Sequence, residues 1–280
     1  MKEEILANES GIRLVCFLGI FAFMILWEFV APRRERSVSR WIRWPSNLGI
    51  VAFNTVVLRV LFPVAAVGFS VLSEDKGWGL LNVFALPSLL AIVLSVVLLD
   101  LAIYLQHVMF HAVPLLWRLH RMHHTDLDFD VTTGTRFHPV EILLSMGIKL
   151  AVVAAFGPPM VAVLIFEILL NASSMFNHGN VSIAPKVDSV LRLFVVTPDM
   201  HRVHHSILPH ETNSNFGFNL PWWDRLFRTY IAQPANGHEG MTIGVEQFNA
   251  PRELRLDRML IQPFLGEVGN YPINRQSDRR

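Results

Sequence analysis

Long apolar runs separated by short polar linkers fill the first part of the chain. Three of them extend from about Ile12 to Val30, from about Leu48 to Leu72 and from about Leu80 to Leu105. Each is close to the roughly 20 residues that a helix needs to cross a bilayer. The pattern therefore predicts three long transmembrane helices, which form an N-terminal membrane region over residues 1–90 and continue into the next segment.

A fourth apolar stretch, Val140 to Phe176, is interrupted by Gly157-Pro158-Pro159. Because proline cannot continue a helix and glycine permits a turn, residues 140–176 are predicted to form a membrane hairpin of two helices. Arms of about 17 residues barely cross the hydrocarbon at about 1.5 Å per residue, so the hairpin either dips into the bilayer or spans it. In both cases its two ends return to the same side. We expect an all-α integral membrane protein.

The charged linkers predict the sidedness of the spans. The linker Pro32 to Pro45 contains five arginines and one glutamate, which places it in the cytoplasm by the positive-inside rule. The loop Ser73 to Trp78 and the N-terminus are net acidic, and the latter predicts a retained first span rather than a cleaved signal. Everything after residue 106, apart from the hairpin, is then expected on the cytoplasmic face. We expect a multi-pass protein of a bacterial inner membrane rather than of the endoplasmic reticulum.

Composition supports the membrane assignment and excludes several classes of protein. Hydrophobic residues make up 52% of the 280 positions and charged residues 17%, as is typical of membrane proteins. The net charge of +1 provides no basic field for nucleic acid. The single cysteine, Cys16, rules out an internal disulfide and a thiolate cluster. A transition metal would therefore be held by imidazole, carboxylate or water.

Histidines are concentrated in a few repeated motifs. The pentapeptide HxxHH occurs at His120–His124 and again at His201–His205. Each copy presents three imidazoles at i, i+3 and i+4, near one face of a helix, where they can converge on a metal ion. Two copies suggest two ions. His107 and His111, at the end of the third span, form a further i, i+4 pair, so we predict a histidine-rich helical cap on the cytoplasmic side.

Several polar residues in the predicted spans have open roles. Asp100 and Tyr104 share a helical face with His107 and could bond the second nitrogen of a ligand, or Asp100 could simply lie at the membrane interface. Arg59 either faces a bundle interior or shows that the second span is misplaced. Lys149 and Glu167 either snorkel or line the site.

The order HxxxH, HxxHH, hairpin, HxxHH resembles the fatty acid hydroxylase superfamily, which includes sterol desaturases, sterol methyl oxidases and alkylglycerol monooxygenase. The resemblance spans about residues 95 to 230, and we place a catalytic domain at residues 91–235. The flanking segments that carry it are Leu116-Trp117-Arg118-Leu119, Arg136-Phe137-His138-Pro139-Val140-Glu141, Asn177-His178-Gly179-Asn180, Thr212-Asn213-Ser214-Asn215-Phe216-Gly217 and Trp223-Asp224-Arg225-Leu226-Phe227.

This resemblance implies a non-haem di-iron centre that uses dioxygen to hydroxylate or desaturate a lipid. The metal ligands that it implies are His107, His111, His120, His123, His124, His178, His201, His204 and His205, with His138 as a less certain one. Some members have a histidine where this chain has Ser174. Whether His138, an asparagine or a water completes the set is left open.

Residues outside these motifs have weaker signals. Asn180 and Asp224 lie in family-like segments, where they either support a ligand by a hydrogen bond or serve local caps and turns. His238, beside Gly237 and Glu239, is expected in a solvated, polar cytoplasmic tail over residues 236–280. Within this tail the amphipathic run Leu254 to Phe264 is predicted to lie on the membrane surface.

The expected function is therefore a membrane-bound oxidoreductase that acts on a sterol-like, fatty acyl or ether lipid at an unactivated C–H bond. The sequence contains no cytochrome-like domain or flavin motif, so we expect a separate ferredoxin or cytochrome-type donor with its reductase. Zinc can replace iron in purified protein, since imidazole binds both. A zinc-dependent hydrolase is the first alternative, although HExxH is missing. Metal transport or storage is the second, although its ligands should lie near the bilayer midplane.

Overall fold

The computed structural model describes residues 2–62, 64–84 and 86–276. In this part of the chain the regular structure is helical, and no β-strand forms beyond two isolated bridges, Pro32 with Val181 and Ser206 with Ile243. The predicted all-α class is confirmed.

Five stretches of the described chain are long and apolar enough to cross a membrane. They are Glu4–Val30, Arg40–Val83, Ser88–Ala112, Pro139–Phe156 and Met160–Asn177. The helices within them are α1 (Lys2–Val30), α2 (Arg40–Leu61), α3 (Ala66–Asp75), α4 (Leu80–Val83), α5 (Ser88–Ala112), α7 (Pro139–Phe156) and α8 (Met160–Asn177). This agrees with the expected integral membrane protein.

The predicted second span, Leu48 to Leu72, was wrong as one continuous helix. Helix α2 ends at Leu61, and α3 begins at Ala66. The sequence has a proline after Phe62, and a residue before proline is driven out of the helical conformation. Phe62 accordingly has φ −124° and ψ 78°. Arg59 is exposed in the last turn of α2 rather than at mid-span.

The third span also starts later than predicted. Helix α5 begins at Ser88, directly after Pro87, and the predicted start at Leu80 belongs to the single turn of α4. At its other end α5 continues to Ala112 and therefore carries His107 and His111, as expected.

The hairpin is confirmed, with its break at the predicted place. Helix α7 ends at Phe156 and is capped by Gly157, whose φ of +61° is a left-handed conformation that glycine adopts without strain. Helix α8 starts right after Pro159. The start of α7 and the end of α8 therefore lie toward the same end of the bundle.

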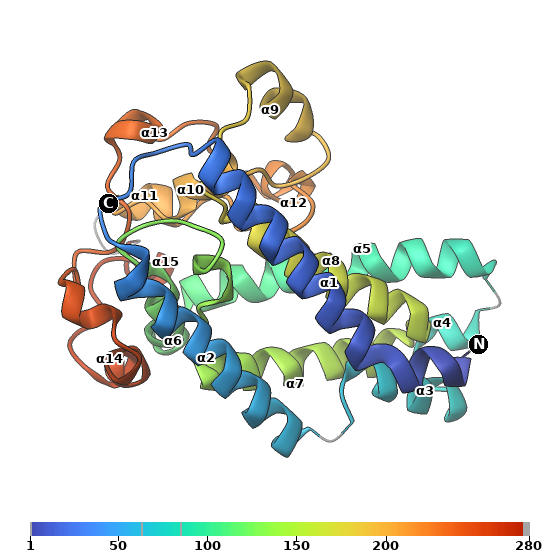
Figure 1. The fold of residues 1–280 in the computed structure, drawn as a ribbon. Helices are drawn as coiled ribbons and strands as arrows, with labels where there is room; N and C mark the ends of the chain where they lie inside the picture. The colour runs from blue at the N-terminus through green and yellow to red at the C-terminus, as the bar shows by residue number, and fades with distance from the viewer. Residues whose placement is uncertain (1, 63, 85, 277–280) are drawn as a thin grey trace.

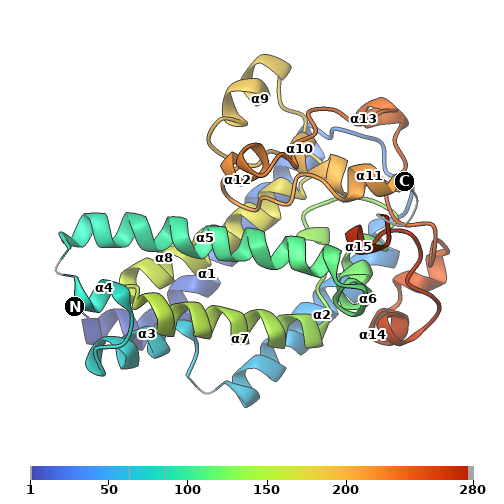
Figure 2. The ribbon, with the colours of Figure 1, turned by 180° about the vertical axis from the view of Figure 1, so that it is seen from behind.

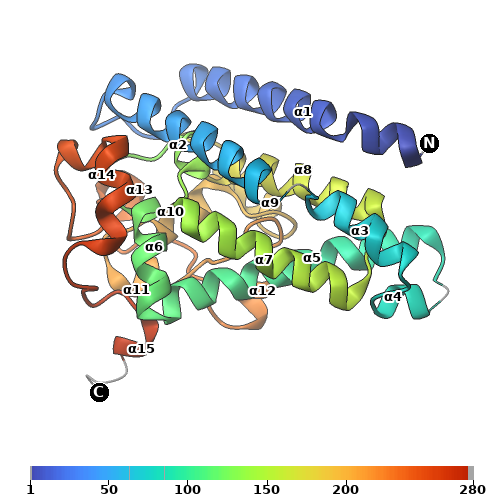
Figure 3. The same ribbon diagram turned by 90° about the horizontal axis from the view of Figure 1, so that it is seen from below.

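The long helices surround an apolar core. In Figure 1, α7 and α8 diverge from the break that joins them, and α5 packs against both; Figure 3 shows α1 next to α8 and α2 next to α7. Helix α3 packs across α7 and α8 at the end that is farthest from the histidines. Buried residues between them include Leu99, Met146, Val163 and Phe166.

The remaining helices form a cap at the end where α5 stops and α7 starts, as Figures 1 and 2 show. They are short and joined by irregular segments. They comprise α6 (Pro114–His124), η1 (Thr133–Thr135), α9 (Pro185–Leu191), α10 (Pro198–His204), α11 (Pro209–Thr212), α12 (Trp222–Leu226), α13 (Gly237–Gly240), η2 (Pro251–Leu254), α14 (Leu256–Ile261), η3 (Gln262–Phe264) and α15 (Ile273–Gln276).

A buried ion-pair network fastens the start of α2 to this cap. The fully buried guanidinium of Arg43 forms two hydrogen bonds with Asp126, at 2.7 and 2.8 Å, and one with Asp130 at 2.7 Å. Burial by itself raises the pKa of Asp126, but the Arg43 charge outweighs it and lowers that pKa to about 2. Part of the positive charge of the predicted linker is therefore neutralised within the fold.

The C-terminal segment is not a detached polar tail. Met259 is buried against Ile50 of α2 and Met122 of α6. The run Leu254 to Phe264 thus directs only part of its apolar side chains into the protein, while Ile261 and Phe264 stay exposed, so its place on the membrane surface stays a prediction. The prediction for His238 was wrong, because only 6% of this residue is exposed.

Candidate metal centre

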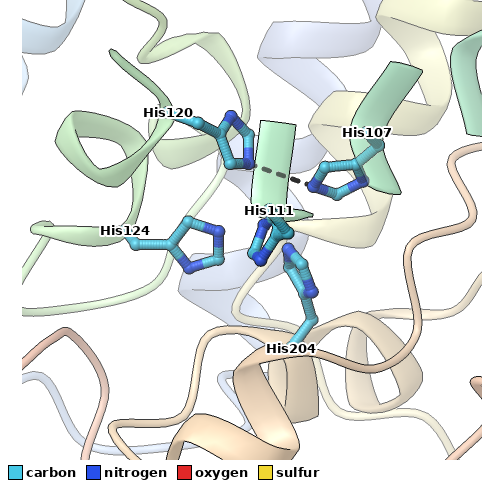
Figure 4. A group of neighbouring side chains, drawn as sticks. All are labelled: His107, His111, His120, His124 and His204. Carbon is cyan, nitrogen blue, oxygen red and sulfur yellow. Dashed lines mark hydrogen bonds between the residues drawn. The ribbon is translucent and has the colours of Figure 1, made fainter. Parts of the chain in front are cut away.

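Nine of the ten predicted ligand histidines gather in two buried groups. Within each group the candidate ligand atoms all lie within 4.8 Å of one another. The five-histidine group, shown in Figure 4, consists of His107, His111, His120, His124 and His204. The four-histidine group consists of His123, His178, His201 and His205.

The two pentapeptides do not form one site each, as their spacing suggested. In the first copy, His120 and His124 join the five-histidine group, whereas His123 joins the other. In the second copy the division is reversed, with His204 in the five-histidine group and the flanking pair in the four-histidine group. The i and i+4 positions lie one above the other on a helix, and i+3 points to the other side of that row. Each pentapeptide therefore serves both groups.

Short helices with proline starts place these motifs. Helix α6 begins at Pro114, with only Val113 between it and the end of α5, and α10 begins at Pro198. Proline is favoured in the first helical turn because its missing N–H has no partner there. The Thr197 hydroxyl caps α10 by accepting the Met200 N–H at 3.4 Å. His178 is the C-cap residue of α8, directly after its last helical residue, Asn177.

Four of the five Nδ1 atoms of the five-histidine group, all except that of His124, lie within hydrogen-bond distance of protein acceptors. His107 donates to the Phe216 carbonyl at 2.8 Å, and His204 donates to the Ser214 carbonyl at 2.7 Å. His111 lies 3.1 Å from Oδ1 of Asn213.

The same arrangement is found at His120 and at two members of the four-histidine group, whereas Nδ1 of His201 and of His205 has no partner in the described chain. His120 donates its Nδ1–H to the Glu141 carboxylate at 2.7 Å. His123 and His178 donate to the carbonyls of Arg136 and Ser174 at 3.2 and 2.8 Å. When Nδ1 carries the proton and donates it, Nε2 of the neutral imidazole is unprotonated, and its lone pair points into the group.

These lone pairs face one another at short range. Nε2 of His107 lies 3.0 Å from Nε2 of His120, and Nε2 of His123 lies 3.1 Å from Nε2 of His178. Two unprotonated nitrogens at this separation repel each other unless a cation lies between them. Two nitrogens that each bind one ion at about 2.1 Å, at a right angle, are about 3 Å apart. The donor set therefore fits a metal ion.

Protonation is disfavoured at six of the nine grouped histidines. Burial, reinforced by the neighbouring imidazoles, lowers the pKa of His123, His124, His201, His204 and His205 well below the usual value. Burial lowers the pKa of His178 to about 3. Among the described residues, Nε2 of His204 and both nitrogens of His124 have no hydrogen-bond partner. Unpartnered buried nitrogens are costly, and imidazoles without thiolates suit iron, zinc, copper or nickel.

A cavity of about 250 Å³ adjoins the five-histidine group. His107 and His120 form part of its wall, together with apolar residues of α1, α2, α5, α7 and α8. Lys149 and Glu167 line this cavity as an ion pair at 2.7 Å, and Arg13 contacts the same carboxylate at 2.9 Å. Of the two roles open for Lys149 and Glu167, lining the cavity is the one observed.

His138 lies outside both groups, unlike the other predicted ligands. It caps α7, where its Nδ1 accepts the Val140 N–H at 3.2 Å. Its Nε2 donates to the carbonyl of Leu260, also at 3.2 Å. Both ring nitrogens are therefore in use, and we leave His138 out of the proposed ligand set.

Asp100 and Tyr104 do not bond a ligand histidine, contrary to prediction. Asp100 accepts hydrogen bonds from Asn219 at 2.7 Å and from the Trp223 indole at 2.8 Å. The Tyr104 hydroxyl bonds the Thr229 hydroxyl at 2.9 Å. Asp100 is two helical turns from His107, which at about 1.5 Å per residue is too far for contact.

Asn180 does not hydrogen-bond a candidate ligand, as one of its two possible roles required. Asp224 supports a ligand indirectly, by holding the backbone that the ligand bonds. Asn180 bonds the backbone of Arg34 at 2.9 and 3.0 Å. Asp224 accepts the N–H groups of Phe216 and Gly217 at 2.8 and 2.9 Å and so fixes the residue whose carbonyl binds His107. Burial raises the pKa of Asp224 to about 6.

Two side chains that bond candidate ligands had no predicted role. Glu141 and Asn213 both lie in the segments that carried the family resemblance, Glu141 in the first turn of the hairpin and Asn213 after the last pentapeptide. Their polar side chains within these segments were the only sequence feature that could have indicated a contact with a ligand histidine. The carbonyl partners have no signal in sequence.

Comparison with known proteins gives the same picture. Residues 92–229 match the family model for fatty acid hydroxylase. The ornithine lipid hydroxylase OlsE of Rhizobium tropici is 30% identical over 148 residues, which cover 53% of this chain and 44% of that protein. The alkylglycerol monooxygenase of Xenopus tropicalis is 26% identical over 209 residues, covering 72% of this chain and 45% of that protein. The human alkylglycerol monooxygenase is 28% identical over 155 residues, covering 53% and 32%.

The matched parts of this chain therefore span less than half the length of each of these relatives. No solved structure matches the chain.

Proposed function

Residues 92–229 form a fatty acid hydroxylase domain, and from this we propose that the protein hydroxylates a lipid at an unactivated C–H bond with dioxygen as co-substrate. One oxygen atom enters the C–H bond and the other leaves as water, with two electrons and two protons supplied from outside. The relatives named as a lipid hydroxylase and a monooxygenase support hydroxylation over desaturation.

One observation carries the proposal. His107 and His120 belong to the five-histidine group and also line the apolar cavity, so a metal ion held by this group would lie next to a ligand in the cavity. The five-histidine and four-histidine groups would each hold one iron ion. Iron bound there would activate dioxygen toward a C–H bond, which has no polar handle for acid–base chemistry. The chain itself contributes neutral imidazoles whose Nδ1–H groups are fixed by carbonyls and by Glu141.

The cavity walls would position the lipid and exclude water. Apolar side chains such as Ile103, Phe110 and Phe137 line it beside the histidines. Placing the reacting carbon close to the oxidant is itself a large part of the rate enhancement that an enzyme provides. A dry pocket also protects the oxidant from side reactions.

One wall of the same cavity is polar. Glu141, Ser145 and Lys149 follow at i, i+4 and i+8 on α7 and all line the cavity. At one end of this row Glu141 is hydrogen-bonded to His120, and at the other end Lys149 is paired with Glu167. A purely hydrocarbon ligand would gain nothing from this row. We therefore propose an amphipathic lipid whose polar group lies in the cavity within about 12 Å of the reacting carbon, which is the rise of the eight residues from Glu141 to Lys149 at about 1.5 Å each.

Electrons would come from a separate ferredoxin or cytochrome-type protein. The arginine-rich linker supports a cytoplasmic position for the cap, where such donors are found, and a bacterial inner membrane remains our proposal for the location.

Metal content and oxygen incorporation test the proposal together. Full-length protein from cells fed iron-57 would be analysed by metal quantification and Mössbauer spectroscopy, and lipids of the same cells would be examined by mass spectrometry after growth under oxygen-18. We expect about two irons per chain, one for each nitrogen-rich group, and a labelled lipid.

The control is the double variant His123→Ala, His204→Ala, which removes one imidazole from each group. It should lose both the iron and the labelled lipid. Zinc in a preparation that hydrolyses lipid esters would contradict the proposal in favour of a hydrolase. Metal that is bound without any oxygen-dependent product would favour transport or storage.

A further inference from the structure

A second cavity, of about 550 Å³, lies in the cap, between the linker after α1, the polar face of α9 and the segment around α12 and α13. Its wall contains Arg33, Arg192 and Arg225, together with the carboxylates of Asp188 and Asp199. None of the nine grouped histidines lines it. The wall therefore has one more cation than anions and is separate from the proposed reaction site.

Two buried side chains of this wall have unused hydrogen-bonding capacity. Arg192 is 4% exposed; its Nε atom lies 2.5 Å from Asp188, and Nη1 donates to the Ala232 carbonyl at 2.6 Å. No described residue accepts a hydrogen bond from its Nη2. Neither ring nitrogen of the buried His238 has a hydrogen-bond partner in the described chain, and the Asp199 carboxylate is 3.6 Å away. Buried donors without acceptors in the chain are satisfied by an acceptor from outside it, either water or a ligand.

Arg225 supplies the surplus charge. Its guanidinium lies over the Tyr230 ring, 4.4 Å from the centroid, and donates to the Arg192 carbonyl at 3.0 Å. It forms no ion pair within the part of the chain that the structure describes. Arg33, by contrast, is paired with Asp199 at 3.1 Å and with Glu239 at 3.3 Å. The cavity thus matches a ligand with one negative charge and several oxygen acceptors.

Exposed apolar side chains surround this cavity on the outside of α9 and α12. We call them the α9/α12 surface. They are Val187, Val190, Leu193, Phe194, Trp222, Leu226 and Phe227, each more than one-third exposed. The Trp222 indole donates to the Leu193 carbonyl at 2.7 Å and joins the two segments.

Contacts with α5 place this surface beside the second half of a helix that is long and apolar enough to span a membrane. Trp223 donates to Asp100 at 2.8 Å, and the Phe227 ring stacks on Tyr104 with centroids 5.4 Å apart. Tyr104 lies roughly 12 Å along the axis before α5 ends at Ala112, at 1.5 Å per residue. Figure 2 shows α12 beside α5, with α9 farther out. Segments in this position meet the acyl chains and headgroups of one leaflet.

We propose that the second cavity binds the phosphate of an anionic membrane phospholipid, whose acyl chains lie over the α9/α12 surface. The single charge of a phosphodiester equals the cationic surplus of the wall. Arg192 and His238 provide donors that are already buried, and Arg225 provides the exposed cation at the rim. A basic pocket next to a membrane-spanning helix is a known way of holding a lipid headgroup.

Native mass spectrometry of the delipidated, full-length protein tests this. The protein in a nonionic detergent would be titrated with phosphatidylglycerol and, separately, with phosphatidylcholine of the same acyl chains. We expect one phosphatidylglycerol to bind at least about tenfold more tightly than phosphatidylcholine, because the choline adds a cation that the wall would repel.

Arg225→Gln should weaken phosphatidylglycerol binding about tenfold, because it removes one charge-assisted contact. Arg228→Gln is the matched control, since this arginine is also exposed and nearby but does not line the cavity. Arg192→Gln would be a second variant, with circular dichroism to check its fold. Metal content, measured on the same samples, reports separately on the histidine groups.

Equal binding of the two lipids, or unchanged binding by Arg225→Gln, would overturn the proposal. Inorganic phosphate gives a third arm of the titration. If millimolar phosphate displaced the lipid completely, the cavity would hold a free phosphate compound and the lipid assignment would be wrong. Displacement by phosphatidylglycerol of bound inorganic phosphate, without the reverse, would support it.

Discussion

Nδ1 of His120 donates a hydrogen bond to Oε1 of Glu141 over 2.7 Å, and both side chains are buried. This contact ties the helix of the first pentapeptide to the first turn of the membrane hairpin. The carboxylate holds the Nδ1–H tautomer and so leaves the Nε2 lone pair directed at His107.

Glu141→Gln should therefore weaken metal binding by the five-histidine group about 10- to 100-fold, because the amide is a poorer acceptor for the ring N–H. Chelator competition on the purified protein measures this directly. Glu239→Gln is the control, as the Glu239 side chain is 84% exposed. If the chelator removed metal equally from both variants, Glu141 would have no part in positioning His120.

His138→Ala should keep both metal ions and lose about 0.5–2 kcal/mol of stability, the usual effect of removing a helix cap. His107→Ala should lose metal, since His107 belongs to the five-histidine group and His138 belongs to neither. Metal quantification and thermal unfolding of the two variants give both quantities. Loss of metal from His138→Ala would restore it to the ligand set.

Gly134→Ala should displace His178 and reduce metal binding by the four-histidine group. An added Cβ would lie 2.3 Å from the Ser174 carbonyl oxygen and 3.1 Å from Nδ1 of His178, and the first of these is backbone that cannot turn aside. The control is Gly147→Ala, where a Cβ meets nothing within 4 Å. It should gain up to about 1 kcal/mol from helix propensity. Matching metal affinities of the two variants would show that the close approach at Gly134 is unimportant.

Glu167→Gln should destabilise the protein by about 3–5 kcal/mol, because it leaves Lys149 and Arg13 without their shared carboxylate. The double variant Lys149→Met, Glu167→Met should be less destabilised, since Arg13 still pairs with Glu9 at 2.7 Å. Unfolding by heat or denaturant in detergent compares the two. A double variant that is less stable than the single one would contradict this account of the network.

The parts of the fold that sequence predicted are those governed by local rules. Gly157 and two prolines determine the hairpin break, and the histidine spacing indicates helices with imidazoles on one side. The break after Leu61 was also encoded, by the proline that follows Phe62, but the apolar run that continues past it obscured the signal.

The division of each pentapeptide between two groups could not be predicted, because spacing fixes directions around a helix and not the neighbours that those directions meet. The same reason explains His138. Its motif is shared with the family, yet its ring turns to cap α7 and to bond Leu260, a residue far along the chain. Carbonyl acceptors such as that of Phe216 depend on the backbone alone.

Because each pentapeptide serves both groups, the order of events during biosynthesis is constrained. His107, His111 and the first pentapeptide leave the ribosome long before His204 and His205. Until α10 has been made, the four-histidine group has only His123 and His178, whereas the five-histidine group lacks only His204. Two imidazoles are too few for a closed metal site, so an ion in the four-histidine group should be acquired only after α10 has folded, and a chain that stops before α10 should insert into the bilayer without it.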